Sequence, residues 1–146
     1  MYSTEFWSIW VAGIIGTTLM TGFSKIWGML LSKEFSEPKL LTDLMRPFIK
    51  KTKAKNNFIG WLVHYLIGIL FAWGIYMYTT TSNGEYTYLT GLILGGLMGF
   101  MGVLGWIILI EAVKITPKLD VPAFFVQLVF AHIVFGLGAI WVFKNF

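Results

Sequence analysis

The stretch that decides the fold is residues 88–110, YLTGLILGGLMGFMGVLGWIILI, which contains no charged residue. The hydrocarbon core of a bilayer is about 30 Å thick, and a helix that rises 1.5 Å per residue needs roughly 20 apolar residues to cross it. Residues 6–31, 58–78 and 121–143 also meet that length, and Lys25 is their only charged residue. With 57% hydrophobic residues and a mean hydropathy of +0.74, the chain is too apolar for a soluble domain of 146 residues. The sequence therefore predicts an all-α integral membrane protein, a bundle of four transmembrane helices in one domain over residues 1–146.

The basic residues indicate how the spans are oriented. Nine of the eleven Lys and Arg residues lie between the first and second spans or between the third and fourth spans. Cytoplasmic loops of membrane proteins are enriched in Lys and Arg, so we expect both of these loops in the cytoplasm and both chain termini outside.

The first cytoplasmic loop, residues 33–57, is predicted to contain a short amphipathic helix that lies on the membrane surface. Pro38 favours its start and Pro47 its end. Its apolar face comprises Leu40, Leu41, Leu44, Met45, Phe48 and Ile49, and its polar face comprises Thr42, Asp43 and Arg46. We expect the lysines that follow to be attracted to anionic lipid headgroups, although the loop could instead dock a partner. These lysines are Lys50, Lys51, Lys53 and Lys55.

An internal repeat relates the two halves of the chain. His64-x3-Gly68-x4-Trp73 in the second span recurs as His132-x3-Gly136-x4-Trp141 in the fourth span, and Leu19-Met20 and Leu97-Met98 begin a weaker echo in the first and third spans. The repeat predicts two tandem helical hairpins with the same orientation. The two histidines should then lie at similar depth in the inner half of the membrane, and the glycine four residues after each would make room on the same helix face.

Two spans carry stripes of small residues. In lipid, small faces that let backbones approach closely are the usual surfaces for helix association. The stripe of the first span comprises Gly13, Gly16, Thr17, Thr21, Ser24 and Gly28, and that of the third span comprises Gly91, Gly95, Gly99, Gly102 and Gly105. We expect both stripes to face protein, in the bundle itself, at a homo-oligomer seam, against another membrane protein or around a ligand.

Four ionisable residues in or near the spans are candidate ligand or proton sites: Lys25, His64, His132 and Glu111. A charge at the centre of the bilayer costs about 2.5–3.5 kcal/mol, so each needs a partner or a route to water. Lys25 can extend to the headgroups or pair with Glu111. The histidines can hydrogen-bond to neighbouring helices, relay protons, or ligate a haem if their ring nitrogens face each other.

Other chemistry lacks support in the sequence. The chain has no cysteine, which excludes disulfides, thiolate metal sites and cysteine nucleophiles. It also lacks a carboxylate pair within a span, a Ser/His/Asp set and a nucleotide-binding glycine loop after a strand. The basic run has no interleaved aromatic residues, so nucleic acid is not an expected partner. We therefore expect no enzymatic activity, no metal site and no cofactor other than the haem alternative.

Short motifs in the first and last spans suggest a family. The segments Ala12-Gly-Ile-Ile-Gly-Thr-Thr-Leu-Met-Thr21 and His132-Ile-Val-Phe-Gly136 resemble the small four-span bacterial inner-membrane proteins of unknown function, of which the YagU-like group is an example. The resemblance implies a bacterial inner membrane, a helical bundle and at most a contribution to acid resistance. It implies no catalytic residues.

The sequence leaves three functions open. The first is a non-enzymatic membrane protein that packs, or binds a lipid or a partner, through its small-residue faces. The second is a small transporter or proton-coupled conduit in which Lys25, His64, His132 and Glu111 converge on a wet cavity. The third is a haem-binding protein that uses the two histidines.

Overall fold

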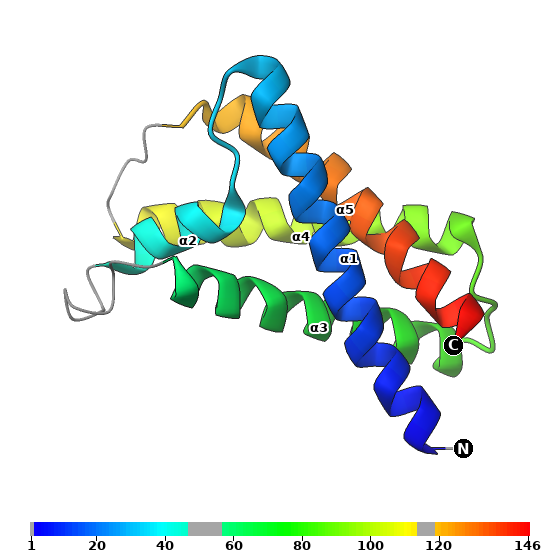
Figure 1. Ribbon diagram of the computed structural model, residues 1–146. Helices are drawn as coiled ribbons and strands as arrows, with labels where there is room; N and C mark the ends of the chain where they lie inside the picture. Colours follow the sequence, from blue (N-terminus) through cyan, green and yellow to red (C-terminus); the bar gives the residue numbers. More distant parts are fainter. Residues whose placement is uncertain (1, 47–56, 114–118) are drawn as a thin grey trace.

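The computed structural model describes residues 2–46, 57–113 and 119–146, which form five helices (Figure 1). They are α1 (Tyr2–Leu31), α2 (Glu37–Met45), α3 (Phe58–Thr81), α4 (Tyr88–Val113) and α5 (Val121–Asn145). The four long helices are apolar and long enough to cross a membrane. The prediction of an all-α integral membrane protein with four spans is therefore confirmed, and the helices extend the predicted spans by about one turn at most.

The ends of the helices follow from local chemistry. Ser32, with a φ of 52°, ends α1 in a left-handed turn in which the Lys33 amide donates to the Gly28 carbonyl at 2.9 Å. Asp120 caps α5 by accepting from the Ala123 amide at 3.2 Å, and its carboxylate also pairs with Lys33. This ion pair connects the C-terminal end of α1 with the N-terminal end of α5.

The long helices are arranged in the order α3, α1, α5, α4, and each packs against its neighbours in that order. In Figure 1, α1 and α5 cross α3 and α4 obliquely. The two outermost helices, α3 and α4, hardly touch each other. The bundle is therefore open along one side, between α3 and α4, and α5 is the most deeply buried of the four spans.

Small residues hold these helix pairs together. A methyl group on Gly13 would lie 2.7 Å from Cα of Ile69 in α3, and one on Gly16 would lie 2.8 Å from the Phe135 ring in α5. The stripe of α1 therefore packs against both α3 and α5.

The glycine stripe of α4 faces α5. A methyl group would lie 2.8 Å from the Gly136 carbonyl oxygen if placed on Gly91, and 2.5 Å from the His132 carbonyl oxygen if placed on Gly95. Gly99 lies similarly close to α5. The two stripes thus do not face each other. Gly105 does not take part in this contact, because it is exposed and a methyl group there would meet no atom within 4 Å.

The short helix predicted in the first loop is present as α2, but its apolar face is covered by protein. Leu40, Leu41 and Leu44 are buried in a cluster with Trp106 of α4 and Phe124 of α5. Phe48, Ile49 and the four lysines predicted to contact lipid lie outside the described residues. In the part of the chain that is described, α2 therefore packs with its apolar face against the ends of α4 and α5.

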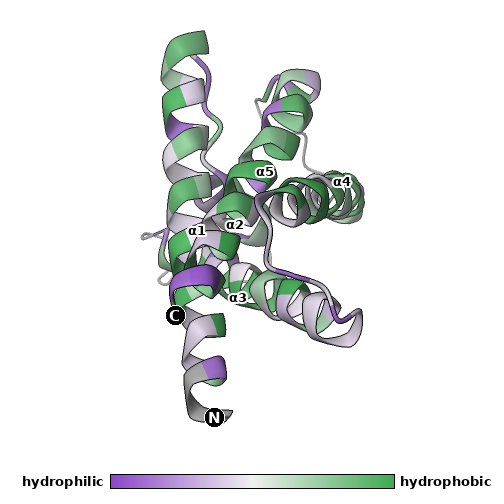
Figure 2. Ribbon diagram, turned by 90° about the vertical axis from the view of Figure 1, so that its right-hand side faces the viewer, coloured by the Kyte–Doolittle hydropathy of each residue, from purple (hydrophilic) through white to green (hydrophobic). Residues whose placement is uncertain are grey.

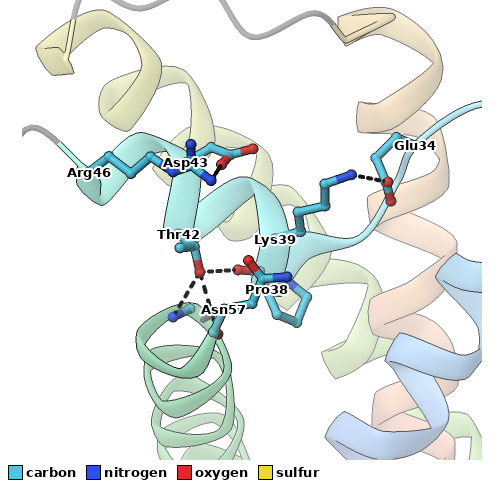
Figure 3. A network of polar contacts seen from close by, with 8 residues as sticks. Glu34, Pro38, Lys39, Thr42, Asp43, Arg46 and Asn57 are labelled. Atoms are coloured by element: carbon cyan, nitrogen blue, oxygen red, sulfur yellow. Dashed lines mark hydrogen bonds and ion pairs between the residues drawn. The ribbon is translucent and has the colours of Figure 1, made fainter. Parts of the chain in front are cut away.

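Thr42 shows how α2 is attached to α3. Its hydroxyl donates to the Pro38 carbonyl at 2.9 Å and accepts from the Gly60 amide at 3.2 Å, and it lies 3.4 Å from the Asn57 carbonyl (Figure 3). The prediction that Thr42 lies on the polar outer face is wrong, since its side chain is 1% exposed. Asp43 and Arg46 do face outward and pair with each other at 3.0 Å.

The hydropathy of the surface agrees with a lipid environment. In Figure 2 the long helices are mainly hydrophobic along their length, and hydrophilic residues gather mostly at helix ends and in loops. Leu92, Ile93, Phe100 and Leu104 of α4 are all about half-exposed or more. A water-soluble protein would bury such side chains, so these faces are the ones that contact lipid.

Candidate functional site

A cavity of about 660 Å³ occupies the open side of the bundle, between α3 and α4. Helices α1 and α5 form its back wall, and Leu41 and Met45 of α2 line one end of it. Ile67 of α3 and Met101 and Ile108 of α4 line it while remaining exposed to the outside. The cavity is therefore open sideways, towards the lipid, and its lining is almost wholly apolar apart from Thr17, Glu37, His64 and His132.

His64 is buried in the cavity wall on α3. Its Nε2 lies 3.0 Å from the Thr21 hydroxyl, which itself donates to the Thr17 carbonyl at 2.8 Å. A hydroxyl has a single proton, so we assign the proton of the His64–Thr21 bond to Nε2 of the neutral imidazole. Nδ1 of His64 is then an acceptor, and it has no hydrogen-bond partner among the described residues.

His132 is buried in the same cavity, on α5. Its Nδ1 lies 2.8 Å from the Leu128 carbonyl, and because a carbonyl only accepts, Nδ1 carries the proton. Nε2 is then the acceptor. It lies next to Gly102 of α4, where an added methyl group would be 3.3 Å from it. The edge of the Phe71 ring packs against the imidazole, with ring centroids 5.7 Å apart.

The repeated glycines do not make room for a ring in this cavity. A methyl group on Gly68 would lie 1.8 Å from the Thr17 hydroxyl oxygen, and one on Gly136 would lie 2.2 Å from the Gly91 carbonyl oxygen. Each therefore lets its helix approach the small-residue face of the other helix in its hairpin. The histidines of the repeat both reach the cavity, and the residue that makes room beside His132 is Gly102.

Sequence reasoning missed a buried polar cluster at the inner end of the cavity. Oε1 of Glu37 accepts from the Ser24 hydroxyl at 2.5 Å, and the Gln127 side-chain amide donates to the Ser24 oxygen at 2.6 Å. Glu37 is 1% exposed and Gln127 and Ser24 are fully buried. The one available signal was Gln127, a polar residue in an otherwise apolar span, because Glu37 belongs to a charged loop that the sequence places at the surface.

Burial determines the charge state of Glu37. Desolvation raises the pKa of its carboxyl from 4.5 to about 7, against the hydrogen bonds from Ser24 and Gln127, which lower it. The carboxyl therefore carries a proton in a large fraction of molecules at neutral pH. It sits in α2, outside the four spans.

Three buried oxygens near this wall have no hydrogen-bond partner among the described residues: Thr17 Oγ1, Glu37 Oε2 and Gln127 Oε1. Leaving a buried polar atom unpaired costs about 1–3 kcal/mol, so such atoms are rare in a protein without a reason. Thr17 and Glu37 both line the cavity.

The other two predicted ionisable candidates lie elsewhere. Lys25 and Glu111 are both exposed, neither lines the cavity between α3 and α4, and they are not paired with each other. Of the four groups predicted to converge, the structure thus brings together only the two histidines. The described residues contain no group of three or more His, Asp or Glu side chains that could hold a metal ion.

The haem alternative stays a prediction. Nε2 of His64 is engaged by Thr21, and Nε2 of His132 faces Gly102 of α4. What the arrangement offers is an apolar chamber with a few polar acceptors at its back wall, which is the usual constitution of a small-molecule site.

Comparison with protein-family models, with curated proteins and with solved structures finds no match for this chain. The resemblance to the YagU-like group therefore stays a prediction.

Proposed function

We propose that this integral membrane protein is a non-enzymatic binder of an amphiphilic molecule that enters from the lipid bilayer. The observation that carries the proposal is the apolar cavity of about 660 Å³, open sideways between two spans that hardly touch. At about 30 Å³ per heavy atom, the share of one molecule in liquid water, it holds on the order of 20 non-hydrogen atoms. That is the size of one acyl or isoprenoid chain with its head.

In this proposal the small-residue faces pack helices together and do not contact the ligand, which differs from the prediction made from the sequence. Gly13, Gly16, Gly91 and Gly95 are occupied by contacts within the chain. They support ligand binding by fixing α1 and α5 as the back wall. We therefore place ligand binding in the cavity and not on the small-residue faces. Binding there does not require a homo-oligomer.

The proposal includes an orientation and a location. Basic loops in the cytoplasm put α2 and Glu37 near the inner surface of the membrane and both termini outside. The lysines of residues 50–55 would hold this loop against anionic headgroups. A bacterial inner membrane is the location that the resemblance to the YagU-like group implies.

A cavity-filling variant tests the proposal. Gly105 lines the cavity and has free space where a side chain would begin, so Gly105→Phe should fill the chamber without disturbing helix packing. Gly96 is the matched control, because it lies on the same helix with equal free space and does not line the cavity. Native mass spectrometry from mild detergent, with lipid extraction of the same samples, reports any molecule that copurifies.

We expect a copurifying amphiphile with the wild type and with Gly96→Phe, and its loss with Gly105→Phe. Equal retention by the two variants would contradict the proposal, because the bound molecule would then lie outside the cavity. So would a wild-type protein that neither retains nor takes up any apolar molecule.

A further inference from the structure

We propose that the cavity selects ligands whose head is an uncharged hydroxyl group, and that His64 and His132 are the residues that accept its hydrogen bond. This inference rests on the proposed function, since it names the class of amphiphile that the same cavity binds. Its basis is the balance of hydrogen-bond donors and acceptors at the back wall of the chamber.

Each neutral histidine donates its one ring proton to a hydrogen bond within the protein. Nδ1–H of His132 donates to the Leu128 carbonyl, and Nε2–H of His64 donates to the Thr21 hydroxyl oxygen. The second nitrogen of each neutral ring therefore presents a lone pair and no proton. Because both rings line one cavity, a ligand head meets two acceptors there.

The other unpaired oxygens near this wall do not change the count. Oε1 of Glu37 accepts from Ser24, so Oε2 is the O–H donor when the carboxyl carries a proton, and Gln127 does not line the cavity. The Thr17 hydroxyl is covered by Gly68. A ketone, an ester or an ether would bring a further acceptor to the two imidazole acceptors, whereas a hydroxyl supplies a donor.

An ammonium head could also donate, but the surroundings favour a neutral group. The lining is almost wholly apolar, and placing a charge in it is costly unless a counter-ion is fixed nearby. Glu37 is the one carboxyl that lines the cavity, and it carries a proton in much of the population at neutral pH. Lys25 and Glu111, the nearest charged residues of α1 and α4 towards the inner end, are exposed and line no part of it.

A matched set of ligands tests the selection. Farnesol, its methyl ether and farnesylamine have the same isoprenoid chain and differ in a hydroxyl donor, no donor and a cationic donor. Binding of each to purified full-length protein is measured at pH 7.5 by native mass spectrometry and by quenching of tryptophan fluorescence, because Trp106 lines the cavity. We expect farnesol to bind about tenfold more tightly than the ether, the ratio that one ordinary hydrogen bond produces. The amine should bind more weakly than farnesol.

Variants assign the selection to the histidines. His132→Phe and His64→Phe retain a planar ring and remove an acceptor, so each should reduce the ratio between alcohol and ether towards one while the ether still binds. Tyr65→Phe is the control. It removes a hydroxyl bonded to Thr18, on a residue that does not line the cavity, and should leave the ratio unchanged.

A second measurement uses the unaltered protein and covers the case in which a histidine variant does not fold. The ¹⁵N resonances of labelled histidine report which ring nitrogen lacks a proton, and farnesol, but not the ether, should shift the unprotonated nitrogens of both rings. Equal binding of alcohol and ether, or tighter binding of the amine, would overturn the hydroxyl selection and leave the cavity proposal in place. If none of the three ligands binds, the proposed function fails and this inference fails with it.

Discussion

The buried carboxyl of Glu37 should make the stability of this protein fall as the pH rises through neutrality. Its pKa is about 7 in the folded protein and 4.5 for the exposed group, so the folded state binds the proton more tightly than the unfolded state. The stabilisation is therefore complete below pH 4.5 and is lost as the pH rises to 7 and above. At 1.36 kcal/mol per pH unit, the interval between the two values corresponds to about 3 kcal/mol.

This dependence can be measured by thermal unfolding in mild detergent between pH 4.5 and 8.5. For a chain of this length about 3 kcal/mol corresponds to a fall in Tm of roughly 6–12 °C. Glu37→Gln carries an amide that matches the neutral carboxyl in shape and charge, so its Tm should be much less sensitive to pH over this interval. Glu34→Gln is the matched control, since Glu34 is exposed and pairs with Lys39 at the surface, and it should behave like the wild type.

Two results would refute this reasoning. If Glu37→Gln loses as much stability as the wild type between pH 5 and 8, another group is responsible for the pH dependence. If the wild type gains stability over the same interval, the carboxyl is ionised in the folded protein and the cluster with Ser24 and Gln127 stabilises its charge.

Three further predictions follow from helix contacts and from the orientation. Gly60→Ala should lower Tm and expose α2 to limited proteolysis, because its methyl group would lie 1.8 Å from an α2 carbonyl oxygen. Gly74→Ala is the control and should be tolerated, since the nearest atom to its methyl group would be 3.7 Å away. Gly68→Ala should cost about 1–3 kcal/mol, because its methyl group would lie only 1.8 Å from the Thr17 hydroxyl oxygen. Thr17→Ala should partly restore Tm in the double variant, and independent, additive effects would contradict this contact. Since the chain has no cysteine, Glu85→Cys should react in intact cells with a membrane-impermeant maleimide, and labelling only after cell lysis would reverse the proposed orientation.

Much of the fold could be predicted from the sequence because the bilayer imposes length and hydropathy on each span. Uncharged runs such as 88–110 had to be transmembrane helices, and their ends are close to the observed ones. The stripes of Gly13 and Gly16 in α1 and of Gly91 and Gly95 in α4 could also be identified, since small residues at helical spacing are recognisable without knowledge of the partner. His64 and His132 were recognised as unusual residues in apolar helices.

Which helices become neighbours was decided by the tertiary structure. The spans are apolar on nearly every side, so hydropathy does not distinguish a face that contacts protein from one that contacts lipid. Close approach at Gly16 and Gly136 pairs α5 with both α1 and α4, while α3 and α4 have no such matched faces and stay apart. The cavity is a consequence of that arrangement. The burial of Glu37 follows as well, because α2 packs across the open end of the bundle and carries a loop carboxyl into contact with Ser24 and Gln127.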